Sequence, residues 1–352
     1  MDSLTQAVLG GAVGGAVLGR PLGRKAVLLG AALATLPDLD VLIDYGDAVS
    51  NFTQHRGFSH SLIVLTSLAV LLTPLARRWR RDISATRWFI YFSLVLLTHP
   101  LLDAFTTYGT QLWWPFAGPI SWNAVFIIDP LYTLPLLVPV ALMLWRPVFH
   151  LTLLAGLLIS SLYLAWGVAA QQWMLQRVEP LLVEHQWQGA PLLIQPMPFN
   201  TLLWRITVLA DDQQVEIITG VLDPDPQPVA QRLPRDMDAL ALAQQFDATG
   251  QLETFTGGFI GAYRHQHDGV PQLVVKDIRL GLPGAYPFHF VVAEQHDEQW
   301  QAVSPYQLDR PMINPQAWPA LWQRILGRKP VLCLGSFTLA DTLKQCHSND
   351  AG

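Results

Sequence analysis

The sequence predicts a membrane α-helical bundle of about six transmembrane helices, residues 1–171, followed by a soluble α+β extracytoplasmic domain, residues 172–352. Hydrophobic residues make up 51% of the chain and charged residues only 14%, which is more apolar than an ordinary soluble protein. Apolar segments of 16 to 23 residues recur up to residue 170, and a span needs about 20. A mixed polar sequence with turn signals follows from about residue 172.

The apolar segments are separated by short polar loops. They cover residues 4–19, 26–44, 59–76, 88–105, about 125–145 and 148–170. The first contains glycines at the small-xxx-small spacing that lets two membrane helices approach closely. It begins with Asp2 and has no basic residue ahead of the apolar run, so we expect a retained helix and not a secretory signal.

The basic residues of the loops predict the orientation in the membrane. The loops after the first, third and fifth segments hold nine Lys and Arg, whereas those after the second and fourth hold only Arg56. The positive-inside rule places the nine in the cytoplasm. We therefore expect a multi-pass protein of a bacterial inner membrane with its amino terminus and its C-terminal domain outside the cytoplasm. The net charge of -5 offers no basic footprint for nucleic acid, and the partner that we expect is the lipid bilayer.

The C-terminal domain shows both strand and helix patterns. Residues 205–222 and 272–282 contain alternating stretches rich in β-branched residues, which favour strands, and residues 237–246 are typical of a helix. The only cysteines, Cys333 and Cys346, are too few for a disulfide framework. One bridge or two separate buried thiols are both compatible with the sequence.

Carboxylates and histidines interrupt the apolar segments between Pro37 and Asp129. Such groups are costly in hydrocarbon, so each needs a partner or a function. Counted along the predicted helices, they fall at the outward end of the bundle. We expect a shared metal site there, and its candidate ligands are Asp38, Asp40, His55, His60, His99 and Asp103.

The spacing of these residues supports the prediction unevenly. His99 and Asp103 are four apart, which puts both side chains on one helical face. Asp38 and Asp40 would diverge on a regular helix, although Pro37 could let both turn inward. Histidine with carboxylate suits Zn, Mn or Fe, and leaves Mg open. We expect Zn first.

A divalent metal at this place would suit hydrolysis, because it activates water and polarises a phosphoryl oxygen. Arg56 is well suited to hold a phosphate, and Asp40 or Asp129 could orient the water. Simpler interpretations remain beside these. Asp129 alone is more typical of a helix cap, Gln6 of an interhelical hydrogen bond, and the tryptophans of an interfacial belt: Trp113, Trp114 and Trp122.

Three short motifs carry a resemblance to a known family: PDLD at residue 37, HRGFSHS at residue 55 and HPLLDAFTTYGTQLWWPF at residue 99. Residues 1–170 resemble the bacterial membrane-bound metal-dependent hydrolases of the YdjM type, also described as LexA-binding inner-membrane hydrolases. Residues 198–205 resemble the start of the outer domain in longer members. The resemblance implies a metal and an inner-membrane hydrolase, similar also to zinc-dependent phospholipase C proteins. Relatives carry a Thr-His pair where this chain has Thr5 and Gln6, which removes one ligand.

The predicted function is therefore an inner-membrane metal-dependent hydrolase that acts on a phosphate ester, such as a lipid, at the periplasmic leaflet. The alternative is a noncatalytic membrane protein in which a metal or an ion-pair network stabilises the bundle while the outer domain binds a partner. An ion pathway is disfavoured, because the cytoplasmic halves of the segments are nearly all apolar.

Overall fold

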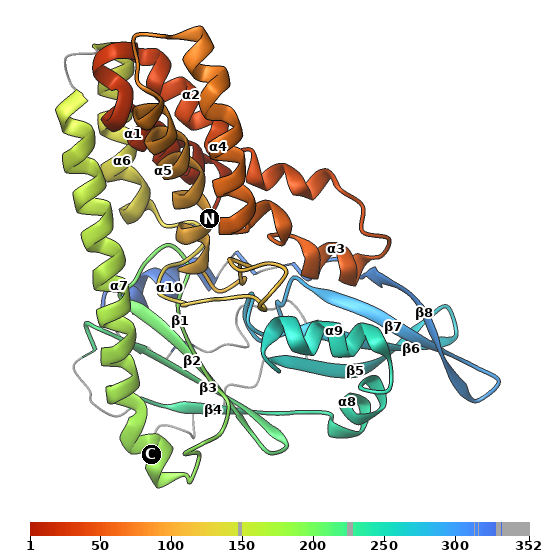
Figure 1. Ribbon diagram of the computed structural model, residues 1–352. Helices are drawn as coiled ribbons and strands as arrows, with labels where there is room; N and C mark the ends of the chain where they lie inside the picture. Colours follow the sequence, from red (N-terminus) through yellow and green to blue (C-terminus); the bar gives the residue numbers. More distant parts are fainter. Residues whose placement is uncertain (147–149, 224–227, 313, 316, 329–331, 333–352) are drawn as a thin grey trace. The chain divides into compact units, whose positions relative to one another are not determined.

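The computed structural model describes residues 1–146, 150–223, 228–312, 314–315, 317–328 and 332 (Figure 1). The chain divides into two compact units. The helical unit comprises residues 1–43, 54–169 and 198–201, and the sheet unit comprises residues 44–53, 170–197 and 202 onward. Cys333 and Cys346 lie outside the described residues, so their pairing stays a prediction.

The helical unit contains five helices and the first part of a sixth. These are α1 (Ser3–Leu22), α2 (Arg24–Ala34), α4 (Leu62–Trp79), α5 (Ala85–Ala104), α6 (Pro130–Trp145) and α7 (His150–Glu184). Local chemistry sets their starts, because the side chains of Asp2, Ser84 and Asp129 accept hydrogen bonds from the first turns of α1, α5 and α6. Two short 3-10 helices, η1 (Pro37–Leu42) and η2 (Phe58–His60), precede α4.

Six transmembrane helices are not supported. Among the described residues, two helical stretches are long and apolar enough to cross a membrane, Leu62–Trp79 and Leu151–Glu184, with mean hydropathies of 1.4 and 1.9. The second predicted segment fails because its end folds as η1, which leaves α2 with 11 residues. α6 has 16 residues. Glycines lower the hydropathy of α1, and α5 carries polar side chains along its length.

Close packing of α1 against α2 confirms the small-residue prediction for the first helix. A Cβ atom on Gly10 would lie 2.2 Å from the Ala34 Cβ, and one on Gly30 would lie 2.2 Å from the Gly10 carbonyl oxygen. Only a residue without a side chain fits at these two positions. The contact fixes the end of α2, where the Ala34 carbonyl enters the site described below.

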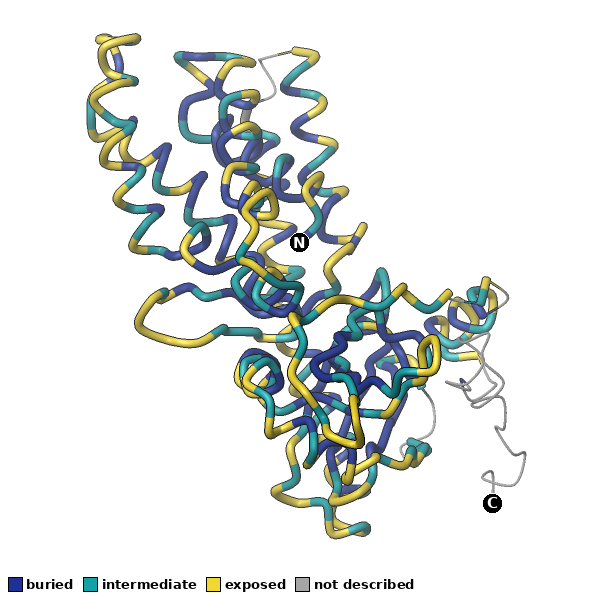
Figure 2. The backbone as a smooth tube through the Cα atoms, turned by 90° about the vertical axis from the view of Figure 1, so that its right-hand side faces the viewer, coloured by how far each residue is buried: buried dark blue, intermediate teal, exposed yellow. Residues whose placement is uncertain are grey.

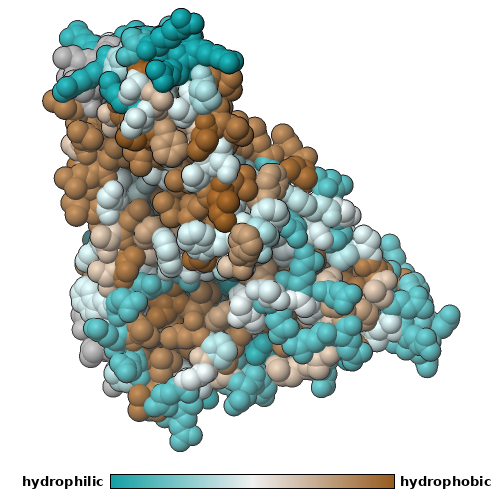
Figure 3. All heavy atoms as spheres, viewed as in Figure 1, coloured by the Kyte–Doolittle hydropathy of each residue, from teal (hydrophilic) through white to brown (hydrophobic). Residues whose placement is uncertain are grey.

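The helical unit buries its large side chains between α1, α5 and α6 and leaves α4 exposed. Trp88, Tyr91 and Leu136 are fully buried. On α4, only Leu65 and Ala69 are buried. Figure 2 colours the backbone by burial. The face of this unit seen in Figure 3 is mostly hydrophobic, with hydrophilic residues gathered at one end. Hydrogen bonds from Arg24 to the Trp145 carbonyl and from Arg87 to the Val17 carbonyl bring basic turns together.

The sheet unit holds two four-stranded antiparallel sheets, β1-β2-β3-β4 and β5-β6-β7-β8. Their strands are β1 (Leu192–Pro196), β2 (Leu203–Ala210), β3 (Gln213–Gly220), β4 (Ala230–Pro234), β5 (Ile260–His267), β6 (Val270–Asp277), β7 (His289–His296) and β8 (Gln299–Gln307). The helices are α3 (Ala48–Gln54), α8 (Met237–Ala243), α9 (Asp247–Thr256) and α10 (Ala317–Ile325). The predicted strands in 205–222 and 272–282 and the predicted helix in 237–246 are thus confirmed.

Candidate metal centre

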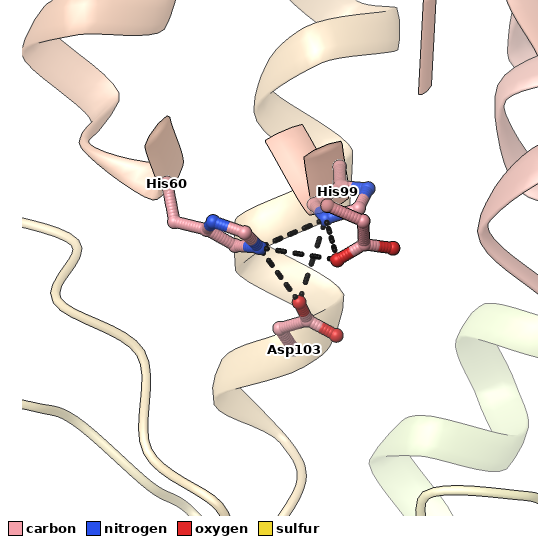
Figure 4. Close-up of side chains that lie close together, drawn as sticks. His60, His99 and Asp103 are labelled. Atoms are coloured by element: carbon pink, nitrogen blue, oxygen red, sulfur yellow. Dashed lines mark hydrogen bonds and ion pairs between the residues drawn. The ribbon is translucent and has the colours of Figure 1, made fainter. Parts of the chain in front are cut away.

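Four side chains of the helical unit converge on one point, and they come from three elements. Asp38 lies on η1, His60 ends η2, and His99 and Asp103 lie one turn apart on α5. One ligand atom from each lies within 4.8 Å of the others. His60, His99 and Asp103 point toward one another in Figure 4, and their side chains are fully buried.

Five distances among the four ligand atoms are close to those of a tetrahedral metal site. His60 Nε2 and His99 Nε2 are 3.0 Å apart. Asp103 Oδ2 lies 3.3 Å from the first nitrogen and 3.5 Å from the second, and Asp38 Oδ1 lies 3.5 Å and 3.4 Å from them. Ligands bound tetrahedrally to zinc at ~2.0–2.1 Å are about 3.3–3.4 Å apart. The observed distances bracket this value.

The hydrogen bond of His99 fixes which of its nitrogens carries the proton. Nδ1 lies 2.6 Å from the carbonyl oxygen of Ala34, and a carbonyl can only accept, so Nδ1 donates. In the neutral ring, Nε2 is then a bare lone pair that points at the other three ligand atoms. The backbone of α2 therefore presets His99 as a ligand through Nε2.

His60 is oriented in the same way through a serine. The Ser59 hydroxyl donates to Asp40 Oδ2 at 2.6 Å and lies 2.8 Å from His60 Nδ1, so its oxygen accepts from that nitrogen. His60 Nε2 is left bare. Two unprotonated nitrogens 3.0 Å apart repel each other unless a cation or a shared proton lies between them.

The 3-10 geometry of η1 explains how two aspartates, two residues apart, both lie close to one histidine. Three residues complete a turn, so Asp38 and Asp40 point about 120° apart and not to opposite sides. Asp38 Oδ1 lies 3.5 Å from His60 Nε2, and Asp40 Oδ2 lies 3.7 Å from His60 Nδ1. Asp38 thus belongs to the group of four, and Asp40 orients it.

The two oxygens of Asp103 have different surroundings. Oδ1 accepts from Gln6 Nε2 at 2.9 Å and pairs with the α-amino group of Met1. Oδ2 is buried and accepts no hydrogen bond from any residue that the structure describes, although Arg56 Nε lies 3.4 Å away. A buried carboxylate oxygen without a donor is costly. The oxygen fits the role of a metal ligand, and so the donor set of two imidazoles and two carboxylates fits a divalent ion such as zinc.

The electrostatics favour a cation at this point. Burial opposes charge on Asp38, but the neighbouring imidazoles of His60 and His99 outweigh it and hold the pKa of this carboxyl below its usual range. Burial likewise opposes charge on His60, yet Asp103 and Asp38 raise the pKa of its imidazole. Protons and metal compete for such a site, because the histidines must be neutral to bind.

Comparison with known proteins identifies what the N-terminal region is similar to. Residues 1–174 match the family model described as YdjM inner membrane protein. The resemblance to the YdjM family is thereby confirmed for this region of the chain. It is also 38% identical over 91 residues to inner membrane protein YbcI of Escherichia coli (strain K12), a match that covers 26% of this chain and 52% of that protein. The chain therefore spans about half the length of this curated relative. No solved structure gives a significant match.

The other predicted site residues surround the group of four in the YdjM region. His55 Nδ1 lies 2.8 Å from Asp40 Oδ1, and the His55 ring is 6.2 Å from the His60 ring. In the described part of the chain, neither His55 nor Asp40 joins the four clustered ligand atoms. Asp129 lies in another environment, because it caps α6 and accepts from Tyr163 at 2.8 Å.

Arg56 lies against the centre. Its backbone N–H donates to Asp40 Oδ2 at 2.9 Å, its guanidinium lies 5.0 Å from the Tyr108 ring, and its Nε has no hydrogen-bond partner among the described residues. Its φ of 62° is a conformation that non-glycine residues rarely adopt. The tight turn between α3 and η2 thus holds a buried guanidinium beside Asp103.

Two contributors were absent from the sequence prediction. The Ala34 carbonyl could not have been found, since no side chain marks it. Ser59 precedes His60 directly in HRGFSH, and a hydroxyl beside a predicted ligand is the signal that could have identified it. Gln6 donates to the His99 carbonyl at 3.2 Å and to Asp103, an interhelical hydrogen-bonding role that the sequence also allowed.

Proposed function

We propose that this protein is a metal-dependent hydrolase of the inner membrane that acts on a phosphate ester, such as a lipid, at the periplasmic leaflet. The observation that carries the proposal is the set of two bare Nε2 atoms and an Asp103 Oδ2 that accepts no hydrogen bond from a described residue, 3.0 to 3.5 Å from one another. Asp38, His60, His99 and Asp103 would hold the ion, most simply Zn, with Mn, Fe or Mg as alternatives. A divalent ion bound there supplies Lewis acidity toward water and a phosphoryl oxygen.

The residues around the ligands would bind the phosphate and position the ligands. Arg56 presents a buried guanidinium whose Nε lies beside Asp103 and makes no hydrogen bond to a described residue, which suits the binding of a phosphate oxygen and of the charge that develops on it. Asp40 and Ser59 hold the His60 tautomer and thereby position a ligand. His55 donates from Nδ1 to Asp40 Oδ1 at 2.8 Å, and its side chain is 25% exposed.

The orientation belongs to the same proposal. The Lys and Arg turns lie at one end of the helical unit and the centre at the other, because α1 begins and α5 ends beside Asp103. The positive-inside rule then puts the basic turns in the cytoplasm and the centre on the periplasmic side of a multi-pass protein. Labelling of single cysteines from outside intact cells would test this topology.

A second function has its own support. Four protein ligands fill a tetrahedron, which is the arrangement of structural zinc sites, whereas catalytic sites keep one position open. For catalysis, Asp38 is the ligand that would have to leave the metal and so open one position. It lies on a short 3-10 helix, and its side chain is 19% exposed while the other three are fully buried. A metal that only stabilises the helical unit is therefore the alternative.

The deciding experiment measures metal content, folding and phosphoesterase turnover in the purified full-length protein. The variants are Arg56→Ala and, as a matched control, Arg87→Ala in the basic turn far from the centre. The hydrolase proposal expects Arg56→Ala to keep its metal and its fold and to lose turnover by about 10²–10³, the usual effect of removing one charge-stabilising donor. Native protein that unfolds when stripped of metal, yet hydrolyses no phosphate ester when loaded, would establish the structural alternative.

A further inference from the structure

The metal centre lies at the end of a membrane-spanning stretch. His60 is two residues before Leu62, where α4 begins, and α4 meets the length and hydropathy of a span. Only 11% of that stretch is buried inside the protein, so most of its apolar surface faces outward. A ligand atom this close to the first turn of a lipid-facing helix lies near the boundary between hydrocarbon and headgroups.

An aromatic loop lies at the same level. The Leu62 backbone N–H donates to the Leu112 carbonyl at 2.9 Å, and Ser61 Oγ donates to the Trp114 carbonyl at 3.0 Å. In the loop held by these two hydrogen bonds, Trp113 is 49% exposed and Phe116 is 80% exposed. Exposed aromatic side chains at the end of a span are typical of the membrane interface.

The 3-10 helix η1 carries an apolar surface next to the exposed ligand. Its period of three directs Pro37 and Asp40 into the protein, and both are buried. Leu39, Val41 and Leu42 are directed outward and are 52%, 71% and 79% exposed. Single exposed apolar residues are common on proteins, but three within four positions beside a metal ligand form a contiguous surface. We call Leu39, Val41 and Leu42 the η1 surface.

The partly exposed ligand of the centre adjoins this surface. Of the four ligands only Asp38 is partly exposed, at 19%, and Asp38 lies on η1 between Pro37 and Leu39. A molecule that reaches the ligand atoms from outside therefore approaches beside the η1 surface. At the inner end of that path it meets the metal ligands and the Arg56 guanidinium, which suit an anionic phosphate.

We propose that the η1 surface is an acyl-chain subsite, and that the substrate is a phospholipid that enters the centre laterally from the bilayer with its phosphate toward Arg56 and its chain on Leu39, Val41 and Leu42. The inference rests on the proposed hydrolase function for its chemistry, but the subsite is a binding claim of its own. An acyl chain gains about 0.8 kcal/mol per buried methylene group, so a short apolar surface suffices to favour lipid over its water-soluble headgroup.

Two variants test the subsite by activity. Leu39→Ala with Leu42→Ala shortens the η1 surface, and Leu71→Ala with Leu75→Ala makes the same change on exposed residues of α4. The substrates are dioleoyl phosphatidic acid and dioleoyl phosphatidylglycerol in mixed micelles, each beside its water-soluble counterpart, glycerol 3-phosphate or glycerophosphoglycerol. We expect the η1 variant to lose about tenfold in kcat/KM for the lipid, which corresponds to about 1.4 kcal/mol. Its metal content and its turnover of the soluble ester stay unchanged.

A binding measurement separates the subsite from hydrolysis. Phosphatidic acid with a photoactivatable acyl chain is crosslinked to the full-length, zinc-loaded protein, and the modified peptides are identified by mass spectrometry. We expect adducts on residues 36–43 that unlabelled phosphatidic acid suppresses. Such adducts without turnover of any ester would contradict the hydrolase proposal and support the acyl-chain subsite. Adducts on α4 and α7 alone, or equal loss of lipid turnover in both variants, would overturn the subsite.

Discussion

A buried ionic cluster of the sheet unit and the candidate metal centre of the helical unit differ in how completely their atoms are paired. In the sheet unit, Arg205 binds Glu216 through two hydrogen bonds of 2.8 Å and 2.7 Å. The remaining guanidinium N–H groups donate to the Ile278 and Gly281 carbonyls, and Gln214 completes the shell of Glu216. In the helical unit, two bare nitrogens face each other and Asp103 Oδ2 accepts no hydrogen bond from a described residue.

This difference separates a structural network from a site. Both clusters are largely buried, so burial alone does not distinguish them. A fully paired network rigidifies its surroundings and leaves nothing for a ligand to satisfy. A cluster with lone pairs directed at a common point is unstable until something positive occupies that point. The pairing of atoms, and not the number of charges, thus identifies the metal centre.

The largest expected effect concerns the paired cluster. Arg205→Met leaves the Glu216 carboxylate buried without its partner, and we expect a loss of about 3–5 kcal/mol in the free energy of unfolding of the sheet unit. The double variant Arg205→Met, Glu216→Leu removes both charges and should recover much of this loss. Hydrogen exchange of the β2 and β3 peptides, measured by mass spectrometry on the full-length protein, reports the difference. Equal destabilisation in the single and double variants would show that packing, and not the unpaired charge, dominates.

The unpaired cluster should respond to the loss of a ligand through metal affinity. Zinc binding to a four-ligand site is worth about 10–16 kcal/mol, so His99→Ala, which removes one of the four, should cost roughly a quarter of it, or about 10²-fold or more in affinity. Metal content after dialysis against a zinc buffer measures the effect. The control is His267→Ala, because His267 is an exposed residue of the β5–β6 turn. Full metal occupancy in His99→Ala would show that α5 does not contribute to metal binding.

An intermediate effect is expected from the residue that orients a ligand without belonging to the four. Asp40→Asn weakens the Ser59 contact that fixes the His60 tautomer, and loss of such outer contacts typically lowers metal affinity about 10–100-fold. Ser59→Ala should show a similar change, since it breaks the same chain of hydrogen bonds. If Asp40→Asn loses metal as completely as His99→Ala does, then Asp40 binds the ion directly, as the sequence analysis expected of it.

Much of the site could be predicted from the sequence, because its main signal is the cost of polar groups in an apolar environment. The i, i+4 spacing of His99 and Asp103 predicted one arm of the centre, and α5 has both residues on one face. The choice between Asp38 and Asp40 could not be made, because it depends on η1 being a 3-10 helix. A proline followed by two aspartates does not determine that geometry by itself.

The division into a helical region and a strand-rich region was predicted correctly, but the predicted number of membrane spans is not supported. Composition separated an apolar N-terminal region from a strand-rich C-terminal one, and both exist. The count failed in residues 26–44, which were counted as one span although Pro37 was expected to break or kink the helix, because the break leaves α2 with only 11 residues. The Arg205–Glu216 network was not anticipated either. Its residues lie in predicted strands, and alternation gives no indication that a charged pair points inward.

The smallest expected effect is a pH dependence confined to the sheet unit. Burial, with Lys276 nearby, lowers the pKa of His289 to about 4 from its ordinary value of 6.5, and Tyr263 contacts its Nδ1 at 2.8 Å. The folded pKa lies below the unfolded one, so the unfolded chain takes up the proton first and stability falls as the pH drops from about 6.5 toward 4. Between pH 7 and 5 we expect a loss of about 1–2 kcal/mol, allowing for partial solvent screening.

His289→Gln removes this titration while keeping a side chain that can hydrogen-bond to Tyr263. Hydrogen exchange of the β6 and β7 peptides at pH 7 and pH 5, corrected for the intrinsic exchange rate, should then show a smaller loss than in the native protein. Metal release from the helical unit at pH 5 should be the same in both proteins, because His289 lies outside the four-ligand group. A change in metal release on His289→Gln would mean that the two clusters are coupled, and their separation into a structural network and a binding site would have to be abandoned.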